Sequence, residues 1–154
     1  MKTQSLIKEF LSQKRFAVVG ISRDPDKFSR RLFRELLRHG YDVAPVNPNA
    51  RELDGKRCYA RIQEIQPPIT SALLLTSWEK ADQILLDCAD AGVTLVWIYG
   101  ISGAKDIGSS ALALCQKHGI EIVPGYCPYM FMPMTAVYHR LHGFVSRAIG
   151  AYPK

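Results

Sequence analysis

The sequence predicts an α/β fold, a doubly wound parallel sheet of about five strands with flanking helices. Short apolar, β-branched runs alternate with stretches of helical periodicity. These runs are apolar throughout rather than at every second residue, which is typical of parallel strands that are buried on both faces. The chain has 154 residues and is 47% hydrophobic, enough for one well-filled core. We therefore expect a single domain over residues 1–154, with a short N-terminal helix and a C-terminal helical extension at about 129–150.

The first part of the chain predicts two helices and two strands. Apolar side chains at helical spacing in residues 6–11 predict an N-terminal helix, and residues 15–20 predict a strand that ends in glycine. A second helix is expected over residues 28–38, because a His-Gly pair follows it and stops it. Residues 41–46 predict the second strand, in which Pro45 lacks an N–H and favours the edge of the sheet.

The rest of the chain continues the alternation of strand and helix. Apolar residues at helical spacing ahead of Gly92 and Gly119 predict one helix before each glycine. A last helix is expected from about Met134. The three remaining strands are predicted at residues 71–76, 94–99 and 121–123.

The turn after the first strand is a candidate phosphate site. In doubly wound folds, ligands bind beyond the carboxyl ends of the strands. Here Gly20-Ile21-Ser22 leads into a helix, whose free N–H groups and dipole stabilise an anion. Gly20 would let a diphosphate approach the main chain, Ser22 could donate a hydrogen bond, and Lys27 or Arg30 could neutralise charge. The alternative is an ordinary strand-to-helix turn with solvated basic side chains.

The same region argues against a dinucleotide site of the common kind. The G-x-G-x-x-G pattern is absent after the first strand. The second strand ends in Val46-Asn47-Pro48, where nicotinamide-dinucleotide folds place an acidic residue for the ribose. An uncharged turn at this place tolerates a phosphorylated ribose, which a carboxylate would repel.

Five segments of the sequence, in this order and spacing, resemble a known family. They are Val18-Val19-Gly20-Ile21-Ser22, Asp24-Pro25-Asp26-Lys27, His39-Gly40-Tyr41, Pro45-Val46-Asn47-Pro48 and Tyr126-Cys127-Pro128. Together they resemble the CoA-binding domain family, the stand-alone relatives of the N-terminal CoA domain of succinyl-CoA synthetase α-subunits. The resemblance covers roughly residues 16–128.

The resemblance implies a Rossmann-like fold that holds the nucleotide of coenzyme A at the tips of the first three strands. It also implies where individual residues lie relative to the ligand. Gly20, Ile21 and Ser22 would lie at the diphosphate, with Lys27 and Arg30 as its charge partners. The adenosine would face Val46, Asn47 and Pro48, and the pantetheine arm would lie beside Thr76 and Ser77.

The function predicted is the binding of coenzyme A or an acyl-CoA without a catalytic domain, as in a sensor or regulatory module. The alternative is a nucleotide-dependent enzyme, either an NAD(P)-linked oxidoreductase or an enzyme that handles acyl-CoA. For that alternative the sequence offers Tyr99, Tyr126 and Cys127 as acid or base candidates. Cys127 could also form a mixed disulfide with the CoA thiol, or be a packed residue in a tight turn.

Charge and composition restrict the partners. The net charge of +6 and the pI of about 9.3 favour an anionic partner. The basic residues are spread along the second predicted helix rather than gathered in an arm, so we expect no nucleic-acid binding. Lys8 and Glu9 interrupt the apolar residues of the N-terminus, and no run approaches the roughly 18 apolar residues of a membrane span. We expect a cytoplasmic protein that does not bind membranes.

The sequence predicts no metal site. The four cysteines are widely spaced, and no third ligand lies near His139 and His142 on the last predicted helix. The apolar side of this helix is a candidate interface for a homo-oligomer or a partner protein.

Overall fold

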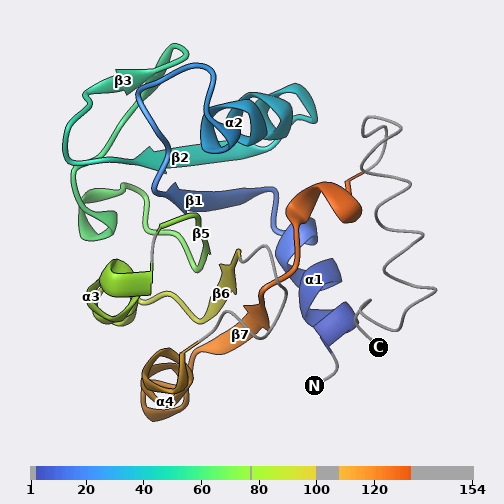
Figure 1. Ribbon diagram of the computed structural model, residues 1–154, viewed down its shortest axis with the longest axis vertical. Helices are drawn as coiled ribbons and strands as arrows, with labels where there is room; N and C mark the ends of the chain where they lie inside the picture. The colour runs from blue at the N-terminus through green and yellow to red at the C-terminus, as the bar shows by residue number, and fades with distance from the viewer. Residues whose placement is uncertain (1–2, 77, 100–107, 133–154) are drawn as a thin grey trace.

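Five parallel strands form the central sheet of the computed structural model, which describes residues 3–76, 78–99 and 108–132. Their order is β2-β1-β5-β6-β7, so the chain moves outward in one direction from β1 and then in the other (Figure 1). The predicted α/β fold with a doubly wound parallel sheet is confirmed. The strands are β1 (Arg15–Val19), β2 (Asp42–Val46), β5 (Ser71–Leu74), β6 (Leu95–Ile98) and β7 (Glu121–Pro124).

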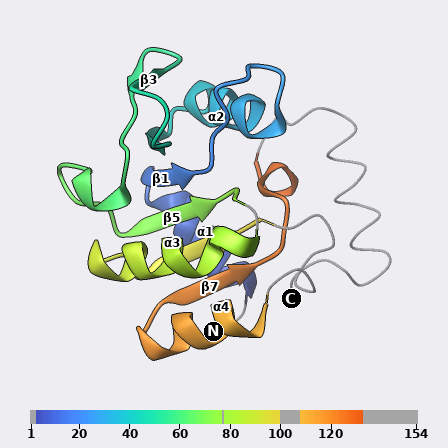
Figure 2. The ribbon, with the colours of Figure 1, turned by 60° about the vertical axis from the view of Figure 1, so that its left-hand side comes forward.

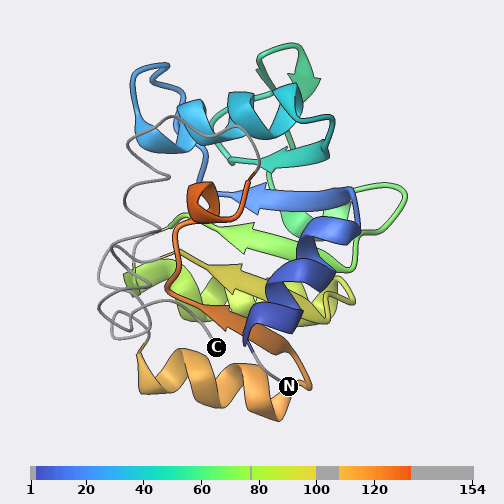
Figure 3. The same ribbon diagram turned by 90° about the vertical axis from the view of Figure 1, so that its right-hand side faces the viewer.

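Within the described residues, four helices cover the two faces of the sheet. α1 and α2 pack on one face, and α3 and α4 pack on the other. Figure 2 shows α3 and α4 in front of the sheet, and Figure 3 shows α1 lying across the opposite face. The helices are α1 (Thr3–Ser12), α2 (Phe28–Arg38), α3 (Trp78–Asp90) and α4 (Ser109–Lys117).

The strands divide their side chains between two cores. Phe16 and Val18 of β1 point into the core under α1 and α2, whereas Ala17 and Val19 point into the core under α3 and α4. All four are buried. Because both faces of each strand are covered, apolar residues at consecutive positions are stabilising, which explains the uninterrupted apolar runs.

The strand β2 lies at the edge of the sheet, as Pro45 predicted. Pro45 pairs in register with Val18 of β1, its single neighbour in the sheet. A missing N–H on the outer side of an edge strand breaks no ladder hydrogen bond, so proline is tolerated here.

A small antiparallel hairpin follows β2 and was not predicted from the sequence. It consists of β3 (Glu52–Leu53) and β4 (Lys56–Arg57). Asp54 and Gly55 form its turn with positive φ angles of 49° and 79°. An Asp-Gly pair with this backbone is the preferred two-residue hairpin connection. Leu53 is buried in the same core as α2, which attaches the hairpin to that helix.

Two single turns complete the description, η1 (Ile62–Glu64) after the hairpin and η3 (Pro128–Met130) after β7. The helix expected from about Met134 lies outside the described residues. No helix in the described ranges is both long enough and apolar enough to cross a bilayer.

Candidate functional site

A pocket of about 510 Å³ lies at the carboxyl edge of the sheet. It opens between the ends of β1 and β2, the turn η1 and the helix α3. The helices after β1 and β5 leave toward opposite faces, so a crevice forms at this switch point of the topology. The sequence-predicted residues that line the pocket are Gly20, Ile21, Ser22, Val46, Asn47, Pro48 and Thr76.

Two predicted residues, Lys27 and Arg30, do not line the pocket. Lys27 is exposed at the start of α2, where it caps the helix without a side-chain hydrogen bond. Arg30 lies in the first turn of α2 and is buried. Ser77 lies outside the described residues.

One wall of the pocket comes from α3 and was not predicted. Lys80, Gln83, Ile84 and Asp87 of this helix line the pocket. They recur at steps of three, one and three residues, which puts them on one helical face. The sequence analysis used the apolar face of this helix, which is offset by one residue from the pocket face. The polar residues beside that apolar face were the signal that could have predicted this wall.

The Asp87 carboxylate ties α3 to the segment before β5. Its Oδ1 accepts hydrogen bonds from Arg61 at 3.0 Å, Gln63 at 3.0 Å and Gln83 at 3.3 Å. The side chain is 18% exposed. These hydrogen bonds hold α3 against the segment before β5 and so stabilise the pocket wall. The donors also compensate the negative charge of Asp87.

Gly20 lines the pocket directly after β1. Its φ of +93° is a conformation that residues with a Cβ rarely adopt. Its N–H donates to the Val46 carbonyl at 3.3 Å, which joins the ends of β1 and β2. The glycine predicted at this turn is therefore required by backbone geometry.

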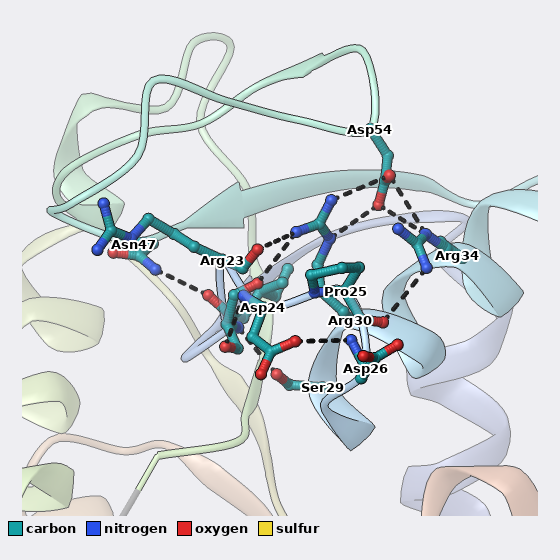
Figure 4. Close-up of polar contacts among 11 residues, drawn as sticks. Arg23, Asp24, Pro25, Asp26, Ser29, Arg30, Arg34, Asn47 and Asp54 are labelled. Atoms are coloured by element: carbon teal, nitrogen blue, oxygen red, sulfur yellow. Dashed lines mark hydrogen bonds and ion pairs between the residues drawn. The ribbon is translucent and has the colours of Figure 1, made fainter.

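The carbonyl groups of residues 21–26, in the turn after β1, are all engaged within the protein, and Figure 4 shows the contacts that Arg30, Arg34 and Asn47 make with them. Each carbonyl oxygen from residue 21 to residue 26 accepts a hydrogen bond, mostly from a side chain of α2. The donors are Asn47 Nδ2 to Ile21 (2.8 Å), Arg30 Nη1 to Ser22 (3.4 Å) and to Arg23 (2.8 Å), the Lys27 N–H to Asp24 (3.3 Å), Arg34 Nη1 to Pro25 (3.4 Å), and Arg31 Nη2 to Asp26 (2.9 Å).

The N–H groups of the turn are in part free. The Ser22 N–H donates to Ser29 Oγ at 2.8 Å, and the Asp24 N–H donates to Ser22 Oγ at 3.0 Å. Within the described parts of the chain, the N–H groups of Ile21 and Arg23 have no acceptor. The Ser22 hydroxyl accepts one bond and keeps its own proton to donate. A turn with occupied carbonyls and available N–H groups can bind an anion.

Arg30 makes a bidentate ion pair with Asp54 of the hairpin. Arg30 Nε lies 2.9 Å from Oδ2 of Asp54, and Nη2 lies 3.0 Å from Oδ1. Arg34 Nε adds two contacts of 3.2 Å to the same carboxylate. The hydrogen bond with Asp54 raises the pKa of Arg30, and the hydrogen bond with Arg30 lowers the pKa of Asp54. Both groups therefore stay charged.

The candidate acid and base residues lie along β6 and β7. Tyr99, directly after β6, stacks on Phe28 with 5.0 Å between ring centroids. The carbonyl of Tyr126 accepts a 2.8 Å hydrogen bond from Trp97 Nε1. Cys127 is partly exposed, and burial raises its pKa. A raised pKa lowers the thiolate population at this position.

No group of three or more His, Cys, Asp or Glu side chains within residues 3–76, 78–99 and 108–132 is placed to hold a metal ion. His139 and His142 lie outside these ranges.

Comparison with known proteins gives a consistent set of relatives. A family model described as "CoA binding domain" matches residues 14–133, which include the whole pocket and the turn after β1. The uncharacterized protein YneT of Bacillus subtilis is 30% identical over 123 residues, which are 79% of this chain and 87% of that protein.

Larger relatives match over part of their length. The α-subunit of ADP-forming acetate–CoA ligase II of Pyrococcus furiosus is 27% identical over 129 residues, 79% of this chain. The match covers 28% of that subunit, so the chain spans little more than a quarter of its length.

Solved structures share the fold. A hypothetical protein from Pyrococcus horikoshii OT3 superposes with a TM-score of 0.73 at 27% identity, over 83% of this chain and 87% of that one. A protein described as PH1109 redesigned for binding gives a TM-score of 0.75 at 25% identity, over 89% of this chain and 96% of that one.

Proposed function

Because the chain belongs to the CoA-binding domain family, we propose that it binds coenzyme A or an acyl-CoA in the pocket at the carboxyl edge of its sheet. One observation carries the proposal. Ile21, which has a free N–H, and Ser22 of the turn after β1 line a pocket of about 510 Å³, within the part of the chain that matches the family. An anion site beside a pocket of this size suits a ligand with a diphosphate and a bulky nucleoside.

The diphosphate of the ligand lies against residues 20–22 in this proposal. The free N–H of Ile21 and the Ser22 hydroxyl donate to its oxygens, and Lys27 supplies a positive charge from the start of α2. The turn at the end of β2, Val46-Asn47-Pro48, carries no carboxylate that would repel the phosphates.

The adenosine occupies the pocket between the end of β2 and α3. Val46 and Ile62 are buried apolar residues of this pocket, and Ile84 of α3 faces it from the other side. Lys80 lines the same pocket and provides positive charge for the 3′-phosphate of coenzyme A. The pantetheine arm then leaves past Thr76 and Ser77.

The proposed role is that of a binding module that responds to acylation state, a sensor or a regulator. The reaction of the larger ligases is not required for this role. The test is calorimetric titration of ligand-stripped protein with coenzyme A, acetyl-CoA, dephospho-CoA, NADH and NADPH at one salt concentration. We expect CoA and acetyl-CoA to bind, dephospho-CoA to bind more weakly, and the nicotinamide nucleotides to bind least.

A pair of charge-reversal variants locates the site. Lys80→Glu places a carboxylate in the pocket, whereas Lys8→Glu makes the same change at an exposed position of α1 on the other face of the sheet. Affinity for CoA should fall in Lys80→Glu and stay unchanged in Lys8→Glu. Equal effects of the two variants would refute this location, and tight binding of NADH or NADPH alone would favour a nucleotide-dependent enzyme instead.

A further inference from the structure

We propose that Arg30 and Asp54 are positioning residues for the anion-binding turn, so that the β3–β4 hairpin is part of the binding site although it does not contact the ligand. The inference rests on the proposed function. It assigns to Arg30 an orienting role in place of the phosphate contact that the family resemblance implies.

The donors of Arg30 are almost fully used by the protein. An arginine side chain has five N–H groups. In Arg30, four hydrogen bonds engage Nε, Nη1 and Nη2, two to Asp54 and two to the carbonyls of Ser22 and Arg23. The side chain is 9% exposed. A bidentate contact with a phosphate would require Arg30 to release either the hairpin or the turn.

The contact with Ser22 fixes the direction of a free donor. In a planar trans peptide, the C=O of one residue and the N–H of the next point in opposite directions. When Arg30 holds the carbonyl of Ser22, the N–H of Arg23 must point away from Arg30. This N–H is one of the two in the turn without an acceptor in the described residues.

Asp54 holds Arg30 in the orientation that makes these contacts. Its two oxygens receive Nε and Nη2, which leaves Nη1 facing the turn, as Figure 4 shows. The hairpin turn places Asp54 there through its left-handed backbone, and Leu53 packs the hairpin against α2. The orientation of the turn thus depends on a residue 24 positions along the chain from Arg30.

The two possible roles of Arg30 predict opposite effects of the substitution Asp54→Asn. If Arg30 contacts a phosphate, removal of the neighbouring carboxylate strengthens anion binding, because the positive charge is no longer compensated. If Arg30 positions the turn, the same substitution weakens binding. Asn tolerates the left-handed backbone of this position, so the hairpin turn itself is preserved.

The experiment compares three variants by CoA titration over a range of salt concentrations. Asp54→Asn and Arg30→Lys should each lower the affinity by about tenfold, the scale expected when hydrogen bonds of a charged group are lost. Arg30→Lys keeps the charge but not the fork of donors. Asp90→Asn is the matched control, since Asp90 is exposed at the end of α3 and does not line the pocket. It should bind as the wild type does.

The salt dependence separates positioning from direct charge contact. A positioning residue leaves the slope of log affinity against log salt unchanged, whereas a phosphate contact of Arg30 that is strengthened by Asp54→Asn makes the slope steeper. Tighter binding by Asp54→Asn, full affinity of Arg30→Lys, or a steeper slope in Asp54→Asn would each overturn the inference.

A second measurement keeps the inference separate from the proposed function. Amide hydrogen exchange of the ligand-free protein should be faster across residues 22–26 in Asp54→Asn and unchanged in β1. If wild-type protein binds no CoA, the proposed function fails and the exchange result alone decides the inference. Unchanged exchange in the turn would overturn it.

Discussion

A Cβ atom on Gly20 would lie 2.7 Å from Cγ2 of Thr76 and 3.0 Å from the carbonyl carbon of Leu75. The end of β1 therefore meets the segment after β5 with no room for a side chain. β1 and β5 are the neighbouring strands at which the strand order reverses, so this contact lies at the base of the crevice.

Substitution of Gly20 should damage both stability and binding. Gly20→Ala adds a backbone strain of about 1 kcal/mol at positive φ and a clash that brings the total loss to about 2–4 kcal/mol. Gly40→Ala is the matched control, because Gly40 has a φ of +83° and nothing within 4 Å of a built Cβ. It should lose only about 1 kcal/mol. Urea unfolding and CoA titration of both variants measure this, and equal losses would contradict the close contact.

The indole of Trp97 fixes the segment after β7. Trp97 is fully buried, and its Nε1 donates to the Tyr126 carbonyl. Trp97→Phe should lower the free energy of unfolding by about 2–3 kcal/mol, because it removes this hydrogen bond and leaves a cavity. Phe10→Leu is a control that reduces the ring contact with Trp97 and breaks no hydrogen bond. A smaller loss for Trp97→Phe than for Phe10→Leu would argue against an anchoring role of the hydrogen bond.

The pair of Arg30 and Asp54 should make stability depend on acid pH. Arg30 lowers the pKa of Asp54 below its ordinary value of 3.8. A depressed carboxyl pKa stabilises the folded state above the unfolded-state pKa, and this contribution is lost as the pH falls through the folded-state pKa. The stability difference between wild type and Asp54→Asn should be constant above about pH 5 and shrink below about pH 4. Urea unfolding at several pH values tests this, and a difference that grows with acidity would contradict it.

The cysteines should react slowly in the folded protein. Burial raises the pKa of Cys88 to about 12 and that of Cys115 to about 11, and it also raises the pKa of Cys58 and Cys127. At pH 8, the shift at Cys88 lowers the thiolate population roughly a thousandfold. Alkylation followed by mass spectrometry should modify the partly exposed Cys127 first and Cys88 last, with all four modified in urea. Rapid formation of a CoA adduct on Cys127 would revive the mixed-disulfide alternative.

The parts of the fold with a local signal could be predicted from the sequence. The runs of consecutive apolar residues predict strands buried on both faces, and Pro45 predicts the edge position of β2. Predicted strands were slightly too long at some ends. The strand β5, for example, stops at Leu74 rather than at residue 76.

The parts of the candidate site that depend on distant residues could not be predicted. The spacing of Arg30 after Gly20 indicates a cation beside a phosphate turn, but no local pattern shows that Asp54 occupies it. The Asp54-Gly55 turn carries a recognisable hairpin signal, and its docking on α2 depends on the burial of Leu53. The helix α3 follows β5, so its place in the pocket wall depends on the pairing of β5 with β1. Hydrophobic periodicity does not predict which strands pair.

The dependence of the turn on Asp54 sets a limit on transplantation of this binding element. A graft of residues 20–30 alone onto another parallel sheet would carry Arg30 without its carboxylate partner. The freed guanidinium would be able to fold onto whatever anion is nearest, including a phosphate or an acidic side chain of the host. The smallest segment that can be transferred with the turn in its present conformation therefore runs from β1 through β4. A design that omits the hairpin would contain the sequence of the turn but not its conformation.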